Sequence, residues 1–392
     1  MFDNNQTPSL PPDRLVLRPE VGPAGDVLVA IFLRGGMDGV YTVPPYADPA
    51  FHSQRKDLGA AAPRPNGLID LDGFFALHPD FAPLAPLYRE KLLAVVHAAG
   101  LHEPLLSHFD ATRAIERGSA DEGENSGWIG RHLNLQPTRN PSPLRAVALG
   151  QSVPRVLSGA DARLLDSWTD FRLELPAGWN PGFIESLRKL YARGTDLVSS
   201  AGRGTLETLA TFERLAKSLP RSQPIGDYPT DGFGRHLRQV AQLIKAEVGL
   251  EAAVLGIDGW DTHISQAKEL VNPMRSLAEN LQGFVADLED HIRRVVVVVI
   301  SEFGRRIVPN DGGGTDHGRA TAMLVLGGGI RGGKVYGTWP GLASQELDEQ
   351  GNLRVTTDYR HVLAEILERR LKCTALRQVF PDFQPDYLQL TA

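Results

Sequence analysis

The sequence has little of what marks several classes of protein. It contains one cysteine, Cys373, among 392 residues, so an internal disulfide and a thiolate metal cage are both excluded. No segment reaches the roughly 18 consecutive apolar residues of a membrane-spanning helix. Basic residues are in deficit, because 41 Lys and Arg stand against 47 Asp and Glu. Without a basic field, we do not expect nucleic acid or anionic lipid as a partner.

The composition is that of a globular protein with a sizeable core, since 42% of the residues are hydrophobic and 22% are charged. Residues 1–25 are polar and rich in proline, which predicts an N-terminal tail on the surface. The α/β domain is expected to start at about Asp26 and to run to residue 392.

Short apolar runs predict strands at residues 26–33, 92–99, 144–150, 250–257, 295–300 and 321–328. Apolar residues at spacings of three and four predict helices at residues 204–219, 231–248, 270–294 and 358–371. This alternation predicts an α/β fold, a doubly wound, mostly parallel sheet with helices on both faces. Residues 295–300 show no polar alternation, as expected of a central parallel strand. Residues from about 150 to 245 have few strand signals and predict a mostly helical insertion.

Polar, glycine-rich clusters follow several predicted strands. In open α/β sheets, ligands bind beyond the carboxyl ends of the strands, so these clusters are expected at one edge. They are residues 34–39 (RGGMDG), 107–110 (SHFD), 258–263 (DGWDTH), 301–306 (SEFGRR) and 314–318 (GTDHG). Glycine allows the sharp bends and close backbone approaches that such a site needs.

The carboxylates and imidazoles in these clusters predict a metal site. The candidate ligands are Asp38, Asp261, His263, Glu302, Asp316 and His317. Such ligands suit a divalent cation, Zn²⁺ or Mn²⁺ first and Mg²⁺ or Ca²⁺ as alternatives. Without a cation, several carboxylates at one sheet edge would repel one another. Taken alone, Asp38 is equally a turn aspartate, and residues 261–263 equally a helix N-cap.

Three further residues are candidates for the chemistry. Ser107 is the candidate nucleophile, because the N–H groups of a helix start would bind an oxyanion or phosphate; the alternative is a plain N-cap. Arg34 and Arg305 are candidates to hold an anionic ester, or else are salt-bridge partners. His97, in an apolar strand, is expected to be a core histidine.

In combination, these motifs and residues 126–128 (SGW) resemble the DUF1501 family over residues 26–381. That family is placed with the alkaline-phosphatase and sulfatase-like superfamily. The resemblance implies a doubly wound α/β sheet with two metals at its carboxyl edge. It also implies hydrolysis or transfer of phosphate or sulfate esters by a Ser, Thr or formylglycine nucleophile.

The resemblance also implies roles by position. Asp38 resembles the aspartate that bridges a metal and the nucleophile region, and Ser107 the nucleophile. The metal-holding positions are matched by Asp261, His263, Glu302 and His317. One departure concerns the acid-plus-histidine pair, which here is Glu302-Phe303. One imidazole is therefore missing, unless Asp316 or His108 takes its place as a ligand.

The sequence therefore predicts a metal-dependent hydrolase of a small phosphate or sulfate ester. The alternative is a non-catalytic relative that keeps the fold as a binding or secretion-associated protein. The phenylalanine at position 303, where the resemblance implies a histidine, favours this alternative. The N-terminal residues lack the basic and apolar regions of a secretory signal, so we expect the cytoplasm. Many relatives carry twin-arginine export signals, and a periplasmic location follows if such a signal was omitted from this sequence.

Overall fold

The computed structural model describes residues 25–59, 63–65, 67–119, 121–136, 142–167, 181–218 and 226–392. The predicted N-terminal tail lies outside the described residues except for Gly25.

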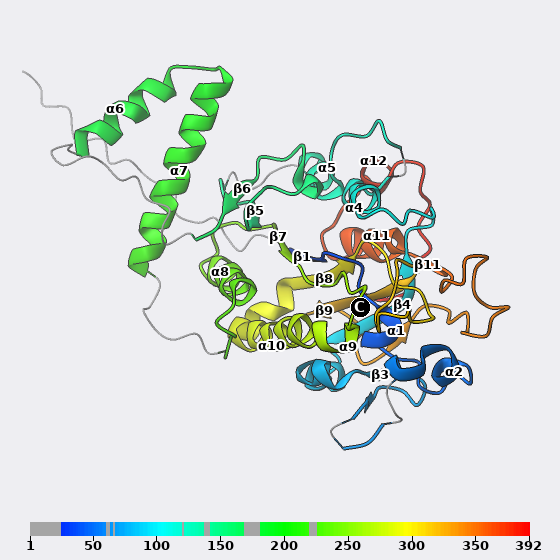
Figure 1. Ribbon diagram of the computed structural model, residues 1–392. Coiled ribbons are helices and arrows are strands. Elements are labelled where there is room, and N and C mark those ends of the chain that lie inside the picture. The colour runs from blue at the N-terminus through cyan, green and yellow to red at the C-terminus, as the bar shows by residue number, and fades with distance from the viewer. Residues whose placement is uncertain are drawn as a thin grey trace, which may run out of the picture.

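A large sheet forms the centre of the molecule, and its strands in the described part of the chain lie in the order β10-β4-β9-β8-β1-β7-β5-β6, with β11 also paired to β4 (Figure 1). The strands are β1 (Val27–Leu33), β4 (Leu93–Gly100), β5 (Ala146–Leu149), β6 (Arg163–Leu165), β7 (Ala252–Ile257), β8 (Val295–Ser301), β9 (Thr321–Gly327), β10 (Val335–Tyr336) and β11 (Thr357–Asp358). A separate small sheet pairs β2 (Ile69–Asp70) with β3 (Ala76–Leu77). All the strands predicted from apolar runs are present.

The large sheet is mostly parallel, as predicted. The exception is β9, which runs antiparallel to both of its neighbours, β4 and β8. The expectation that residues 295–300 form a parallel strand therefore holds on only one side, where β8 pairs with β1. An unbroken apolar run indicates a strand that is buried on both faces. Parallel and antiparallel strands can both be buried in this way, so the run does not predict the direction.

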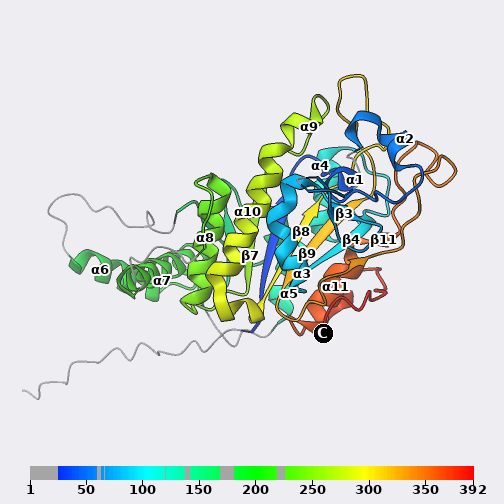
Figure 2. The same cartoon turned by 90° about the horizontal axis from the view of Figure 1, so that it is seen from below.

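Helices cover both faces of the sheet, which confirms the doubly wound arrangement (Figure 2). They are α1 (Gly39–Thr42), α2 (Phe51–Arg55), α3 (Ala85–Arg89), α4 (His108–Arg117), α5 (Trp128–Leu135), α6 (Pro181–Ala192), α7 (Leu197–Ser218), α8 (Gly232–Lys245), α9 (Gln266–Glu269), α10 (Val271–Leu288), α11 (Tyr359–Arg369) and α12 (Leu376–Val379). None of these helices is long and apolar enough to cross a bilayer.

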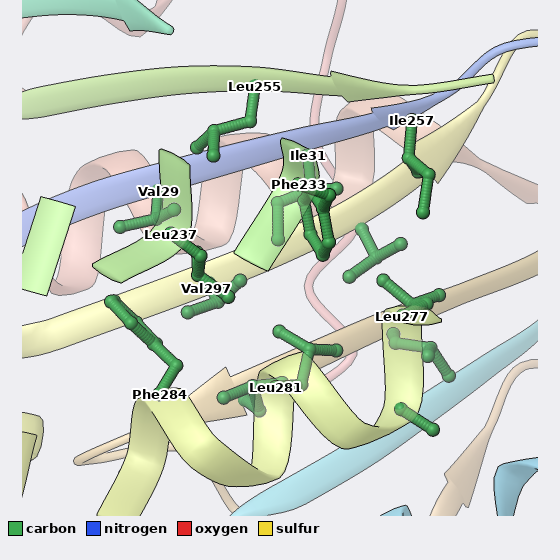
Figure 3. Packing of buried hydrophobic residues seen from close by; sticks show 14 of the residues in the cluster. Val29, Ile31, Phe233, Leu237, Leu255, Ile257, Leu277, Leu281, Phe284 and Val297 are labelled. Carbon is green, nitrogen blue, oxygen red and sulfur yellow. The ribbon is translucent and has the colours of Figure 1, made fainter. Parts of the chain in front are cut away.

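Two cores follow from the alternation of side chains along each strand. Val29 and Ile31 of β1 point to one face, where they meet Phe233 of α8 and Leu281 of α10 (Figure 3). The side chain between them, Ala30, lies in the second core with side chains of α4, α5 and α11. Because both faces are covered, only the ends of the strands are left for a site.

The segment predicted as a mostly helical insertion contains α6, α7 and α8, but also β6 at the edge of the sheet. Helix α8 packs on the sheet, whereas α6 and most of α7 extend away from it, although Phe212 of α7 belongs to the same core as α8 (Figures 1 and 2). The domain boundaries stay a prediction.

Candidate active site

The polar clusters meet at one edge of the sheet. The carboxyl ends of β1, β4, β7 and β8 all point to this edge, because these strands run in one direction. Residues 302–320 lie there too, since β8 ends and the antiparallel β9 begins at the same edge. Helices α1, α4 and α9, which begin just after three of the clusters, gather at the same end of the molecule (Figure 2).

Three imidazoles converge on one carboxylate. Oδ1 of Asp261 lies 3.1 Å from Nε2 of His263 and 3.4 Å from Nε2 of His317. Its other oxygen, Oδ2, lies 3.4 Å from Nε2 of His108. The Nε2 atoms of His263 and His317 are 3.0 Å apart. We call His108, Asp261, His263 and His317 the histidine cluster.

Each imidazole of the histidine cluster is held from behind through Nδ1. Nδ1 of His108 lies 2.8 Å from Oε1 of Glu302, and Nδ1 of His317 lies 2.8 Å from the carbonyl oxygen of Leu106. Nδ1 of His263 lies 3.2 Å from Oδ1 of Asp316. Since these oxygens accept, the proton of each neutral ring is assigned to Nδ1, and Nε2 presents its lone pair to the cluster. Metal-binding histidines are held in this way.

One nitrogen of the histidine cluster, Nε2 of His108, faces the carboxylate of Asp261 at 3.4 Å without a hydrogen bond. Nε2 of His108 is buried and makes no hydrogen bond within the described residues. Buried polar atoms nearly always have a partner, so this atom points to a missing ligand. Ligand atoms of His108, Asp261 and His317 lie within 4.8 Å of one another, which suits a metal ion.

The pKa values of Asp261, Asp316 and His317 are shifted in the directions that favour their metal-binding forms. Burial raises the pKa of Asp261, but the hydrogen bond and charge of Arg305 hold that pKa below its usual value. Hydrogen bonds from Asn310 and His263 lower the pKa of Asp316. Burial lowers the pKa of His317 and so favours its neutral form.

Arg305 lies behind the cluster, with a fully buried side chain. Its guanidinium donates to Asp261 and to the carbonyl oxygens of Gly35, Gly36, Thr315 and Trp260. It thereby ties the loops after β1, β7 and β8 together. These loops also approach closely at Gly35, where a Cβ atom would lie 2.3 Å from the backbone nitrogen of Asp261.

Asp38 is not brought together with the histidine cluster. Its buried carboxylate pairs with Arg55 and caps α1 by accepting from the N–H groups of Val40 and Tyr41. It also accepts from Nε2 of Gln266, at 2.7 Å. This position fits the turn-aspartate alternative left open by the sequence.

Gln266 links Asp38 to the site loops. Its Oε1 accepts hydrogen bonds from the hydroxyls of Thr262 and Thr315. These threonines are the neighbours of site residues in two different loops, and the N–H of Thr315 also donates to the carbonyl of Thr262, at 3.1 Å. Gln266 therefore holds the two loops in register.

Ser107 is the N-cap residue of α4, but its side chain is exposed and makes no capping hydrogen bond. It stands between Leu106, which accepts from His317, and His108. The serine hydroxyl is therefore exposed and adjacent in sequence to two residues of the site.

Arg34 lines an open cleft of about 670 Å³ beside the histidine cluster. His108, Asp261 and Glu302 line the same cleft, and Arg34 pairs with the buried Glu116 on its far wall. Two further arginines of this lining, Arg113 and Arg155, make no ion pair within the part of the chain that the structure describes. The lining carries three arginines and three acidic residues, Glu116, Asp261 and Glu302, so the cleft has no net formal charge, and Arg113 and Arg155 are the cations placed to meet an anion.

Sequence reasoning gave His108 only as one of two replacements for a missing imidazole. Phe303 was recognised as a departure, yet its packing was not foreseen. The ring centroid of Phe303 lies 4.8 Å from those of both His108 and His317, so the phenyl ring supports the two imidazoles. Glu116 and Gln266 carry no sequence signal, because Arg34, Asp38 and Thr315, with which they pair, lie 49 or more positions away along the chain.

Several solved structures resemble this chain, with low sequence identity and low TM-scores. Ps i-CgsB is 13% identical, with a TM-score of 0.36, and the match covers 80% of this chain and 68% of that one. The PH0037 protein from Pyrococcus horikoshii is 12% identical, with a TM-score of 0.33 and coverage of 90% and 98%. Alkaline phosphatase from the Antarctic bacterium TAB5 is 10% identical, with a TM-score of 0.33 and coverage of 80% and 95%. We draw no conclusion about activity from likenesses of this size.

No curated protein matches the chain. A family model does match, that of DUF1501, described as a protein of unknown function, over residues 96–381. The matched region contains the whole histidine cluster, together with Ser107 and Arg305. It begins after β1, so Arg34 and Asp38 lie outside it. Since the match covers more than half of the sequence, the chain belongs to the DUF1501 family.

Proposed function

We propose that the chain is a metal-dependent hydrolase of phosphate or sulfate esters. The observation that carries this proposal is the convergence of three Nε2 atoms on Asp261, each on a ring held from behind through Nδ1. The motif resemblance implies the same chemistry.

The histidine cluster fits a divalent cation. Two ligands that each lie about 2.0–2.2 Å from one ion are about 3 to 3.5 Å apart. The distances of 3.0, 3.1 and 3.4 Å within the cluster fall in this range. A cation would also bind Nε2 of His108, which faces Asp261 and makes no hydrogen bond among the described residues.

Of the predicted ligands, we therefore retain Asp261, His263 and His317, and we add His108. Glu302 and Asp316 orient two of the imidazoles, and Asp38 supports the loops through Gln266. Zn²⁺ or Mn²⁺ bound by the cluster would polarise an ester oxygen and offset the charge of the transition state.

The chain's own residues would bind and attack the ester. Arg34, Arg113 and Arg155 in the cleft carry charge that complements phosphate or sulfate oxygens. The N–H groups at the start of α4, which the side chain of Ser107 does not cap, would add donors for the same anion. We assign the role of nucleophile to the uncapped hydroxyl of Ser107.

The test is metal content and ester hydrolysis on the same preparations. Protein purified without added metal is analysed for metal and assayed with p-nitrophenyl phosphate and p-nitrophenyl sulfate, alongside Ser107→Ala, His108→Ala and His291→Ala. His291 is the matched control, because it lies before β8 at the opposite edge of the sheet.

We expect bound metal and hydrolysis in the wild type and the control. His108→Ala should lose both, and Ser107→Ala should lose hydrolysis but keep the metal. Bound metal with no hydrolysis of any ester would favour the non-catalytic alternative. Absence of metal, together with no thermal shift on adding Zn²⁺ or Mn²⁺, would refute the proposal.

A further inference from the structure

A second cavity of about 480 Å³ lies beside the cleft of the candidate site. The two spaces share Arg34, Ser152 and Pro154. The second cavity extends past the ends of β5 and β7 to the start of α8 and is lined by no member of the histidine cluster. Arg34 therefore stands between the cluster and a further binding space.

Gly256 lines this second cavity from within β7 and is the exposed residue of an otherwise buried strand. A Cβ atom there would meet nothing closer than the carbonyl oxygen of Phe32, at 3.9 Å, and Nε of Arg34, at 4.0 Å. Gly256 is also not among the glycines with positive φ. Neither packing nor backbone conformation thus requires glycine, whose effect is to leave space beside Arg34. A glycine inside a strand often marks close approach of a ligand.

The lining of the second cavity is polar at the rim and apolar behind it. Gln151, Ser152 and Asp258 are exposed and make no side-chain hydrogen bond or ion pair among the described residues. They offer amide, hydroxyl and carboxylate groups that suit a ligand with hydroxyls. Phe233 and Leu149 add apolar surface. The charge of Asp258 offsets that of Arg34 in this lining, so the second cavity favours a neutral group over a second anion.

We propose that the second cavity holds the organic group of the substrate, and that this group is neutral, ring-sized and hydroxyl-bearing. This inference rests on the proposed function, since the anionic end of the ester must lie in the cleft on the other side of Arg34. The cavity has the volume of a site for a small organic molecule, whereas a short alkyl group would leave most of it to water.

The experiment measures binding, so it needs no turnover. Zn²⁺-loaded protein is titrated by calorimetry with inorganic phosphate, ethylphosphonate, the phosphonate analogue of a hexose 6-phosphate, and naphthylmethylphosphonate, and then with sulfate and the matching sulfonates. The variants are Gly256→Val, which fills the space beside Arg34, and the smaller Gly256→Ser. Gln151→Ala removes one rim group and leaves Gly256 in place.

We expect the wild type to bind the hexose analogue at least about tenfold more tightly than ethylphosphonate, a clear difference in affinity. Gly256→Val should abolish this advantage and leave the affinity for inorganic phosphate or sulfate unchanged. If that variant unfolds at a lower temperature, the same selective loss in Gly256→Ser and Gln151→Ala decides the question.

Three results would overturn the inference. If the hexose analogue binds no more tightly than ethylphosphonate, or if the variants keep its tighter binding, the second cavity does not hold the organic group. Binding of the inorganic anion would still support the proposed function in that case. Equally tight binding of naphthylmethylphosphonate would refute the inference that the organic group bears hydroxyls. Failure of every anion to bind would refute the proposed function, and the inference with it.

Discussion

His97 and His108 show how hydrogen bonding separates a structural histidine from a candidate ligand. Nε2 of His97 lies 3.0 Å from the carbonyl oxygen of Val43, and its Nδ1 accepts from the N–H of Ala98, at 2.8 Å. Both ring nitrogens are satisfied, so His97 is a core histidine, as the sequence predicts. His108, by contrast, has a buried Nε2 with no hydrogen bond among the described residues.

The neutral form of His97 makes stability depend on pH. Burial lowers its pKa to about 4, whereas the unfolded chain titrates near 6.5. The unfolded state therefore takes up the proton first as the pH falls. The contribution of His97 to stability is complete above about pH 6.5 and is lost toward pH 4, at up to about 1.4 kcal/mol per pH unit.

Urea unfolding between pH 7 and pH 4.5 measures this slope, and His97→Gln should make it shallower. His132, whose pKa burial also lowers to about 4, adds to the slope of both proteins, so the difference between them is the readout. Equal slopes would show that His97 is not held neutral.

Phe303 supports the histidine cluster by packing and not by coordination. It is buried, and its ring contacts the imidazoles of His108 and His317. Phe303→Ala should cost about 3–5 kcal/mol of unfolding free energy, as for other buried phenylalanines, and should weaken Zn²⁺ binding as well. Phe303→Leu keeps most of the volume and should recover most of both losses. Undiminished Zn²⁺ affinity in Phe303→Ala would contradict this role.

At the scale of elements, Gln266 at the start of α9 fixes the loop after β7 against the loop before β9. Gln266→Ala should weaken metal affinity about 10- to 100-fold, as for other residues that orient ligands without touching the metal. Calorimetric Zn²⁺ titration measures this loss, and Gln350→Ala on an exposed loop is the control. A drop in unfolding temperature with unchanged Zn²⁺ affinity would show that Gln266 is purely structural.

The strands were predictable from sequence because apolar runs of six to eight residues have the length of a buried strand and are shorter than most helices. The direction of β9 was not, because burial on both faces is the same for parallel and antiparallel strands. This direction matters, since it brings Asp316 and His317 to the edge where β8 ends.

The site itself was partly predictable. The rule that parallel strands present their carboxyl ends at one edge indicates where Asp261, His263 and Glu302 lie. Sequence could not separate side chains that face the cluster from those behind it. Asp38 meets Arg55, 17 positions away, and Glu302 meets His108, 194 positions away. Such pairings depend on loop geometry that a spacing pattern does not contain.

At the scale of the whole molecule, metal binding should stabilise the fold, because the histidine cluster draws on loops after β4, β7 and β8. A ligand at 1,000 times its dissociation constant adds about 4 kcal/mol to the unfolding free energy. Removal of the metal by EDTA should therefore lower the melting temperature, and Zn²⁺ should restore it. Calorimetric scans of His317→Ala should show no response to either treatment; a response equal to that of the wild type would place the metal elsewhere.

The central claim is that the histidine cluster holds a divalent metal. Anomalous diffraction at the zinc edge, from crystals grown with Zn²⁺, tests it most directly. The account predicts a strong peak about 2.0–2.2 Å from Nε2 of His108, His263 and His317 and from a carboxylate oxygen of Asp261. A map with no peak among these atoms, at Zn²⁺ concentrations that saturate binding in solution, would contradict it.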